Sequence, residues 1–193
     1  MPKLTQTVAA LILAQLFAWS AMFLLWVFAL PLIRGAMHIS EIVALQWVGI
    51  GLALLASLAA LLNFLLPRLV RRLGATLALG CALLVGSLGL WIIAQADSPT
   101  ALLAGYALVG VGWAGLANLP YKIILHGIEE DRIDPALARF NLSVVVPQVG
   151  LALALPWLFG HFEARFLLHI ASGLMATASA ILIVSHARMK SAA

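Results

Sequence analysis

Six apolar runs, each about as long as a bilayer is thick, follow one another along this 193-residue chain with short polar turns between them. A helix needs roughly 20 apolar residues to cross about 30 Å of hydrocarbon, and its backbone bonds are satisfied internally. The sequence therefore predicts an all-α integral membrane protein with six transmembrane helices. We place the spans at residues 8–33, 41–66, 75–95, 99–125, 135–159 and 164–185. Pro31 is expected to end the first helix, and Pro67 to open the turn after the second.

The basic residues fall mainly on one side of the predicted membrane. With six spans, both termini share a side with the second-to-third and fourth-to-fifth connections, and this side holds nine of the 11 Lys and Arg residues. By the positive-inside rule, both termini are expected in the cytoplasm, with the protein in the inner or plasma membrane. The nine residues are Lys3, Arg68, Arg71, Arg72, Lys122, Arg132, Arg139, Arg188 and Lys190. Topology thus accounts for the net charge of +4, and no nucleic-acid partner is expected.

Catalytic patterns are missing from the sequence. The single cysteine, Cys81, lies inside the third predicted span and is interpreted as a small packing residue. The five His residues are scattered, and no metal-ligand cluster, nucleophile–base pair or phosphate-binding loop is seen. We therefore expect neither enzymatic activity nor a cofactor nor a bound metal.

Polar and aromatic residues share one face of the first span. Gln15, Trp19, Met22 and Trp26 are spaced 4, 3 and 4 apart, which aligns them on a helix. Two indoles and an amide on one stripe suit stacking against, and hydrogen bonding to, a sugar-like ligand. The alternative is that Trp26 belongs to an interfacial aromatic belt and Trp19 packs against other helices.

The fourth and fifth spans carry further polar residues and several prolines. Polar side chains are costly in hydrocarbon and are tolerated where a helix faces other helices or a wet cavity. Two interpretations of the amides Asn141 and Gln148 stay open, namely interhelical fasteners or parts of a ligand cavity. Pro120 and Pro147 are expected to weaken or kink their helices. The polar and aromatic residues of the fourth span that we interpret in the same way are Trp113, Asn118 and Tyr121.

Two further features have a structural and a functional interpretation. A stripe of small residues in the second span, from Gly49 to Ala60, is predicted to be a helix–helix contact face. His169 in the sixth span is a possible proton site, although an intramembrane histidine is more often hydrogen-bonded and neutral. No acidic residue lies deep in any predicted span.

The motifs together resemble sugar transporters of the major facilitator superfamily. Gly112-Trp113-Ala114 with Asn118-Leu119-Pro120-Tyr121, followed by Phe140-Asn141 and Pro147-Gln148, is similar to the second half of sucrose/proton symporters and of glycoside-pentoside-hexuronide cation symporters. The basic turn that contains Arg68, Arg71, Arg72 and Gly74 also resembles a short cytoplasmic loop of the superfamily, in which Arg72 and Gly74 match. The resemblance covers the whole chain as one six-helix half of a twelve-helix protein.

The resemblance implies a secondary transporter of a sugar or glycoside-like solute. The chain is expected to form a single six-helix domain of two inverted three-helix repeats, about 8–95 and 99–187, and to act by alternating access. Its partners would be the solute, a proton or cation where transport is coupled, and another six-helix half or a second copy. The alternative is a membrane scaffold or a truncated remnant that does not transport. The implied solute-binding residues are Gln15, Trp19, Trp113, Asn118, Tyr121, Asn141 and Gln148.

Overall fold

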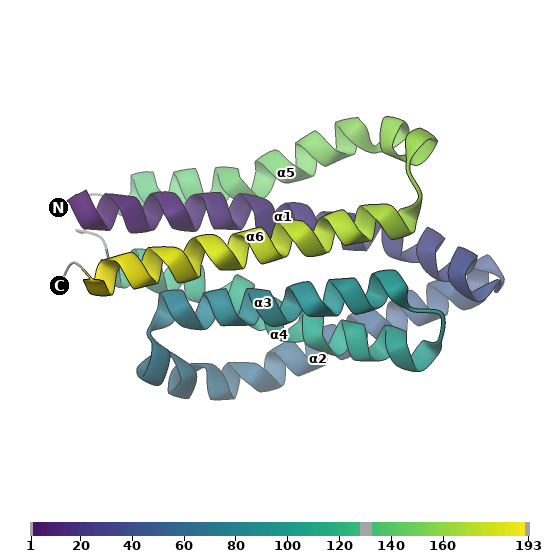
Figure 1. The fold of residues 1–193 in the computed structure, drawn as a ribbon, viewed down its shortest axis with the longest axis horizontal. Helices are drawn as coiled ribbons and strands as arrows, with labels where there is room; N and C mark the ends of the chain where they lie inside the picture. Colours follow the sequence, from purple (N-terminus) through teal and green to yellow (C-terminus); the bar gives the residue numbers. More distant parts are fainter. Residues whose placement is uncertain (1, 128–132, 192–193) are drawn as a thin grey trace.

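The structure, a computed structural model, describes residues 2–127 and 133–191 and folds them into six α-helices that lie side by side (Figure 1). Each helix is long and apolar enough to cross a membrane, which confirms the predicted all-α architecture with six spans. Both termini and the α2–α3 turn lie at one end of the bundle, hereafter the terminal end. The helices are α1 (Pro2–Met37), α2 (Glu41–Leu73), α3 (Ala75–Gln95), α4 (Pro99–Gly127), α5 (Ile133–His161) and α6 (Ala164–Ser191).

Prolines do not end the helices where the sequence analysis expected. α1 continues through Pro31 to Met37, and the buried side chains of Leu32 and Ile33 show why, since the extra turn adds apolar contacts to the core. α2 likewise continues through Pro67 to Leu73. The expected basic loop is therefore helical.

The basic residues of that segment occupy the end of α2. Arg71 and Arg72 lie in its last turn, where the partial negative charge of a helix C-terminus favours cations. Arg68 lies one turn earlier, and only Gly74 connects α2 to α3. Gly74 has φ of 81°, which a glycine adopts without the steric cost of a side chain, so the chain reverses direction over one residue.

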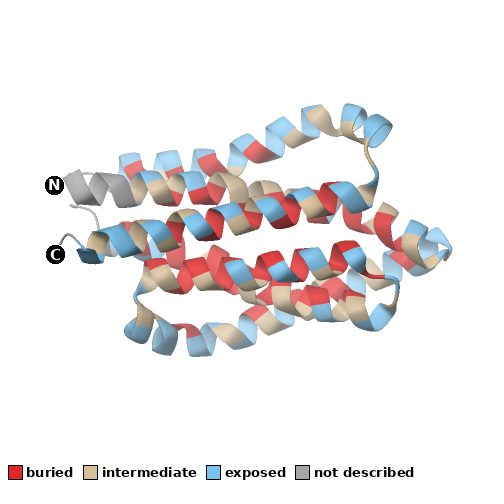
Figure 2. Cartoon of the chain, in the orientation of Figure 1, coloured by how far each residue is buried: buried red, intermediate tan, exposed pale blue. Residues whose placement is uncertain are grey.

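The packing places α3, α4 and α6 at the centre and α2 and α5 at the edges. α3 packs most extensively against α4 and α6, while α1 packs on α6 and α5, and α4 packs on α2. Figure 2 shows buried residues concentrated on the inner helices and pale exposed surface along α2 and α5. The two edge helices therefore keep broad apolar faces that no described part of this chain covers.

Small residues allow α3 and α4 to approach closely. A Cβ atom added to Gly112 would lie 3.0 Å from the Cα atom of Gly86. A Cβ added to Gly89 would lie 2.6 Å from the carbonyl oxygen of Gly105. Backbone thus packs directly on backbone along this pair, as small residues permit between membrane helices.

Serine hydroxyls fasten α3 to α6. Ser87 Oγ donates to the Ser172 carbonyl oxygen at 2.9 Å, and Ser172 Oγ donates to the Ser87 carbonyl oxygen at 2.9 Å. Ser179 Oγ donates to the carbonyl oxygen of Gly80 at 2.7 Å. All three serines are buried, so each hydroxyl is satisfied where water does not reach it.

The small-residue stripe of α2, predicted to be a helix–helix contact face, is not covered by any described helix of this chain. Gly49 has nothing within 4 Å of an added Cβ, and Ala53, Ala56 and Ala60 are exposed. The face that packs on α4 is instead centred on Gly51, where the ring of the fully buried Tyr106 occupies the space of the missing side chain. Burying a large aromatic ring outweighs the closer contact that the alanine face offers.

Candidate functional site

A cavity of about 410 Å³ lies between α1, α4 and α5 and brings together four of the predicted solute-binding residues. Trp19 comes from α1, Trp113 and Tyr121 come from α4, and Asn141 comes from α5. These residues are up to 122 positions apart in the sequence, so only the packing of the three helices makes them neighbours. The remaining lining residues are Leu116, Ala117, Phe140, Val144 and Val145.

Aromatic rings form two edge-to-face pairs on the cavity walls. The ring centroids of Trp19 and Trp113 are 5.4 Å apart at an interplanar angle of 81°, and those of Tyr121 and Phe140 are 5.1 Å apart at 70°. Trp26 adds a third indole, 5.7 Å from Trp113. Such pairs hold the rings in fixed orientations. The walls can therefore stack against a flat apolar face of a ligand.

Polar atoms beside these rings lack protein partners. Trp19 Nε1 and Gln15 Oε1 are buried, and neither has a hydrogen-bond partner among the described residues. The exposed amide of Asn141 likewise shows no hydrogen bond to a described residue. A buried polar group without a partner costs about 1–3 kcal/mol, so the indole N–H of Trp19, which lines the cavity, is suited to bind something other than this chain. The indole N–H donates, whereas the amides both donate and accept.

Pro120 removes one backbone hydrogen-bond donor from α4 beside the cavity. Proline has no N–H, so it cannot donate to the carbonyl oxygen of Leu116, four residues earlier, and Leu116 lines the cavity. α4 nevertheless stays helical from Pro99 to Gly127, and α5 stays helical through Pro147. Both prolines are buried, and α5 visibly changes direction along its length in Figure 1.

Not all predicted solute-binding residues belong to this cavity. Asn118 Nδ2 donates to Asn63 Oδ1 at 3.0 Å and to the Ala114 carbonyl oxygen at 3.0 Å, so Asn118 faces α2. Gln15 is buried in the core and does not line the cavity, and Gln148 is exposed two turns beyond Asn141. His169 is half-buried on α6, a helix that contributes nothing to the cavity.

Sequence reasoning missed the apolar part of the wall. Phe140 precedes Asn141 in the quoted motif, but it was not assigned a role, and Val144 and Val145 follow Asn141 at the helical spacings of three and four. That spacing was a usable signal, because residues three and four apart share a face. The valines look like ordinary membrane residues, however, until a neighbouring helix leaves their face uncovered.

Comparison with family models, curated proteins and solved structures gives no match for this chain.

Proposed function

We propose that this chain is one half of a secondary active transporter for a sugar or glycoside-like solute. It works by alternating access with another six-helix half or with a second copy of itself. The observation that carries the proposal is the cavity where Trp19, Trp113, Tyr121 and Asn141 converge. Aromatic faces next to unpartnered hydrogen-bonding groups are the chemistry that a sugar ring, apolar on its faces and polar on its rim, requires.

The packing supports an inverted repeat of three helices. In such a repeat, α1, α2 and α3 correspond to α4, α5 and α6, respectively. The contact of α1 with α5 then corresponds to the contact of α4 with α2, and the contact of α1 with α6 corresponds to that of α4 with α3. The α3–α6 contact maps onto itself. Because the second set enters from the opposite side of the bundle, this exchange has the geometry of inverted repeats in secondary transporters.

The open edges of the bundle support a second half. α2 and α5 are the least enclosed helices, and the small-residue stripe of α2 presents a face to which another helix can come close. The cavity has walls from α1, α4 and α5 alone. A partner bundle across these edges would complete it, and rocking of the two bundles would expose it to each side in turn.

The wall chemistry favours a neutral solute with an apolar part. No charged side chain is among the lining residues, and most of them are aromatic or aliphatic. A glycoside with an apolar aglycone fits such walls better than a free sugar does, because its aglycone replaces water at the valines. Coupling to a proton or cation would depend mainly on the partner half, with His169 as the possible proton site in this chain.

Intrinsic tryptophan fluorescence tests the proposed site directly. An aryl glycoside and a free monosaccharide, titrated into the purified chain, should each give a saturable change, with the glycoside binding more tightly. Tyr121→Leu and Asn141→Leu should each weaken binding about tenfold, which corresponds to loss of one interaction of roughly 1.4 kcal/mol. Trp91→Phe is the matched control, because Trp91 is exposed on α3 and lies outside the cavity. Equal losses in all three variants would refute the site.

Proteoliposomes test the half-cavity. The monomeric chain alone should show no saturable uptake of the glycoside, and uptake should appear when a matching half or a self-assembled dimer is present. Strong uptake by a demonstrably monomeric chain would overturn the proposal.

A non-transporting scaffold is the second candidate, and the exposed stripe of α2 favours it. Gly49→Leu fills that face and should abolish the association of a partner bundle, whichever candidate holds. The two candidates differ in solute binding. A scaffold would bind no solute before or after Asn141→Leu and would keep its partner, whereas a transporter would bind solute and lose that binding in Asn141→Leu.

A further inference from the structure

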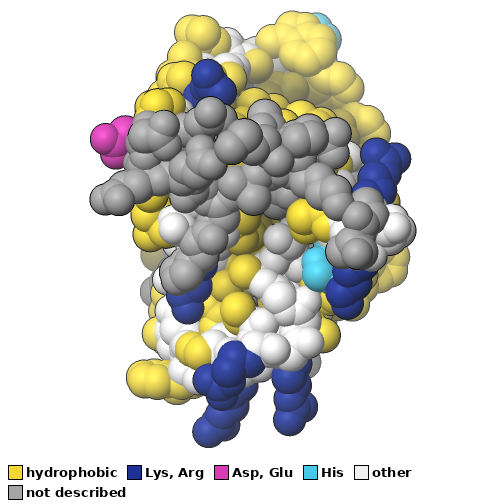
Figure 3. Space-filling model, turned by 90° about the vertical axis from the view of Figure 1, so that its left-hand side faces the viewer, with side chains coloured by type: hydrophobic (Ala, Val, Ile, Leu, Met, Phe, Trp, Pro, Cys, Tyr) yellow, Lys and Arg dark blue, Asp and Glu magenta, His cyan; other side chains and the backbone are white. Residues whose placement is uncertain are grey.

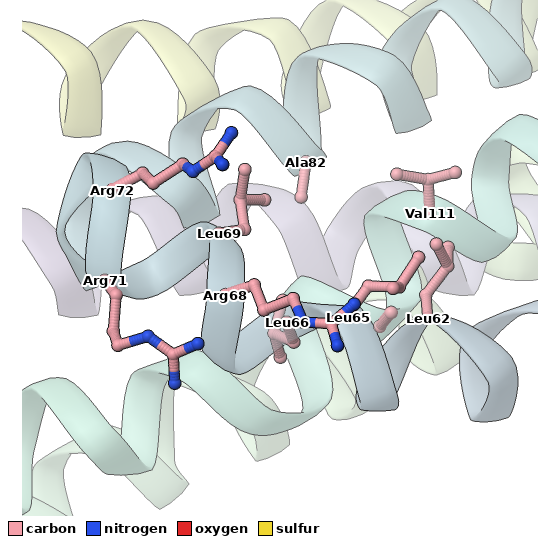
Figure 4. A pocket seen from close by; sticks show the side chains of 10 residues that line it. Leu62, Leu65, Leu66, Arg68, Leu69, Arg71, Arg72, Ala82 and Val111 are labelled. Carbon is pink, nitrogen blue, oxygen red and sulfur yellow. The ribbon is translucent and has the colours of Figure 1, made fainter.

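A second pocket, of about 630 Å³, lies at the terminal end of the bundle between α2, α3 and α4. Three arginines of α2, namely Arg68, Arg71 and Arg72, contribute to its lining. Figure 4 shows Arg71 and Arg72 at one end of the pocket and Val111 at the other, with Arg68 between them. The pocket is therefore basic at one end and apolar at the other.

The three arginines lack acidic partners among the described residues. The ion pair seen among the residues whose side chains the structure describes joins Arg34 to Glu41 at 3.4 Å, at the opposite end of the bundle. All three arginines of the pocket are exposed. Figure 3, which views the terminal end, shows several Lys and Arg side chains around the described part of that face. The guanidinium groups thus form a positive site, without an acidic partner among the described residues, that water and ions can reach.

The rest of the pocket is hydrocarbon. α2 and α3 follow one another in the chain, yet they contact each other only sparsely, and Val111 and Ala114 of α4 form part of the wall between them. Leucines of α2, among them Leu62 and Leu65, line the same space. The groove therefore runs from a basic rim at the membrane surface into the apolar zone of the bundle.

The change from a basic rim to an apolar interior determines which kind of molecule fits this pocket. A phospholipid presents a phosphate at the membrane surface and acyl chains below it, whereas a free phosphate leaves the leucine wall uncovered. A zwitterionic headgroup neutralises its own phosphate, so it gains less from three arginines than an anionic headgroup does. Arginine also binds phosphate oxygens in a bidentate manner.

We propose that this pocket binds one anionic phospholipid from the leaflet at the terminal end. Its phosphate lies among Arg68, Arg71 and Arg72, and an acyl chain lies along the leucines of α2 towards Val111. The lipid fills the space where α2 and α3 do not meet, so it braces the edge helix against the centre of the bundle. This inference does not depend on the solute cavity, which lies between other helices.

Native mass spectrometry of the full chain tests the inference. The protein is released from micelles that contain equimolar phosphatidylglycerol and phosphatidylcholine, and the bound lipids are counted. One phosphatidylglycerol should be retained preferentially. Replacing all three arginines by Gln should weaken its binding about tenfold or more, with phosphatidylcholine unaffected. The matched control replaces Arg139, Arg188 and Lys190 by Gln, which removes the same charge outside the pocket and should change phosphatidylglycerol binding by less than about twofold.

Two further arms separate a lipid from a free anion. Leu65→Ser should weaken phosphatidylglycerol binding severalfold without affecting any binding of inorganic phosphate, because the side chain of Leu65 is apolar and would contact the acyl chain rather than the phosphate. Inorganic phosphate at millimolar concentration should not displace the lipid. Equal losses in the two triple variants, no preference for phosphatidylglycerol, or full displacement by phosphate would each overturn the inference. Unchanged unfolding temperatures of the variants in phosphatidylcholine micelles show that the fold is intact.

Discussion

Two asparagines show why the role of a polar residue in an apolar helix depends on the residues that face it. Asn118 and Asn141 look alike in the sequence, because each is an amide in a membrane span close to a proline. In the structure, Asn118 binds the amide of Asn63 on α2, whereas Asn141 lines the cavity and has no hydrogen bond to a described residue. The first is an interhelical fastener, and the second is free for a ligand. The sequence analysis left both roles open for Asn141 and implied solute binding for Asn118, because the difference depends on which helix lies opposite.

Replacing each asparagine by leucine should separate these roles. Asn118→Leu should lower the free energy of unfolding by about 0.6–1.7 kcal/mol, because it breaks the interhelical bond to Asn63. Asn141→Leu should leave unfolding nearly unchanged and weaken glycoside binding. Reversible unfolding in mixed SDS micelles measures the first effect, and fluorescence titration measures the second.

A double-mutant cycle provides the control for that pair. Asn63→Leu combined with Asn118→Leu should cost less than the sum of the two single changes, since the bond can be lost only once. Additive losses, or a loss of stability in Asn141→Leu as large as that in Asn118→Leu, would contradict the assignment.

The sequence predicted which segments form helices more accurately than it predicted where the helices end and which of their faces are covered. The third span was predicted at the bounds that α3 has, Ala75–Gln95, because Gly74 and the polar Asp97-Ser98 turn mark both ends. The helix ends expected at Pro31 and Pro67 were wrong because packing and end charges offset the loss of one hydrogen bond. Periodicity predicted that the small residues of α2 share a contact face, but it could not show that no described helix of this chain covers that face.

The backbone contact between α3 and α4 leads to a prediction at this scale. In Gly89→Ala the new Cβ would lie 2.6 Å from the Gly105 carbonyl oxygen and 2.7 Å from the Val109 nitrogen, so backbone must move. We expect a loss of about 1–3 kcal/mol in the free energy of unfolding. Gly173→Ala on α6 is the control, since nothing lies within 4 Å and helix propensity should add up to about 1 kcal/mol. Detergent unfolding of both variants measures the difference, and a neutral Gly89→Ala would mean that the helices separate easily.

The whole molecule has two chemically different ends. Arg68, Arg71 and Arg72 lie at the terminal end together with Arg188 and Lys190 in the last turn of α6, whereas the opposite end carries Arg34, already paired with Glu41. The sequence predicted this asymmetry from charge alone, because six consecutive spans fix which turns share a side. What it could not predict is that three of these arginines would gather around one groove, since that follows from the extension of α2 beyond Pro67.

The charge asymmetry predicts how the bundle is oriented, and cysteine labelling measures it. Cys81 is first replaced by Ala, and single cysteines are then introduced as Asp97→Cys and Ser191→Cys, at opposite ends of the bundle. Since basic residues are retained on the cytoplasmic side during insertion, a membrane-impermeant maleimide should label Cys at 97 in intact cells. Cys at 191 should react only after the cells are permeabilised. Labelling at 191 in intact cells would place the arginine groove in the outer leaflet, and labelling of both positions would indicate two orientations, as an antiparallel dimer requires.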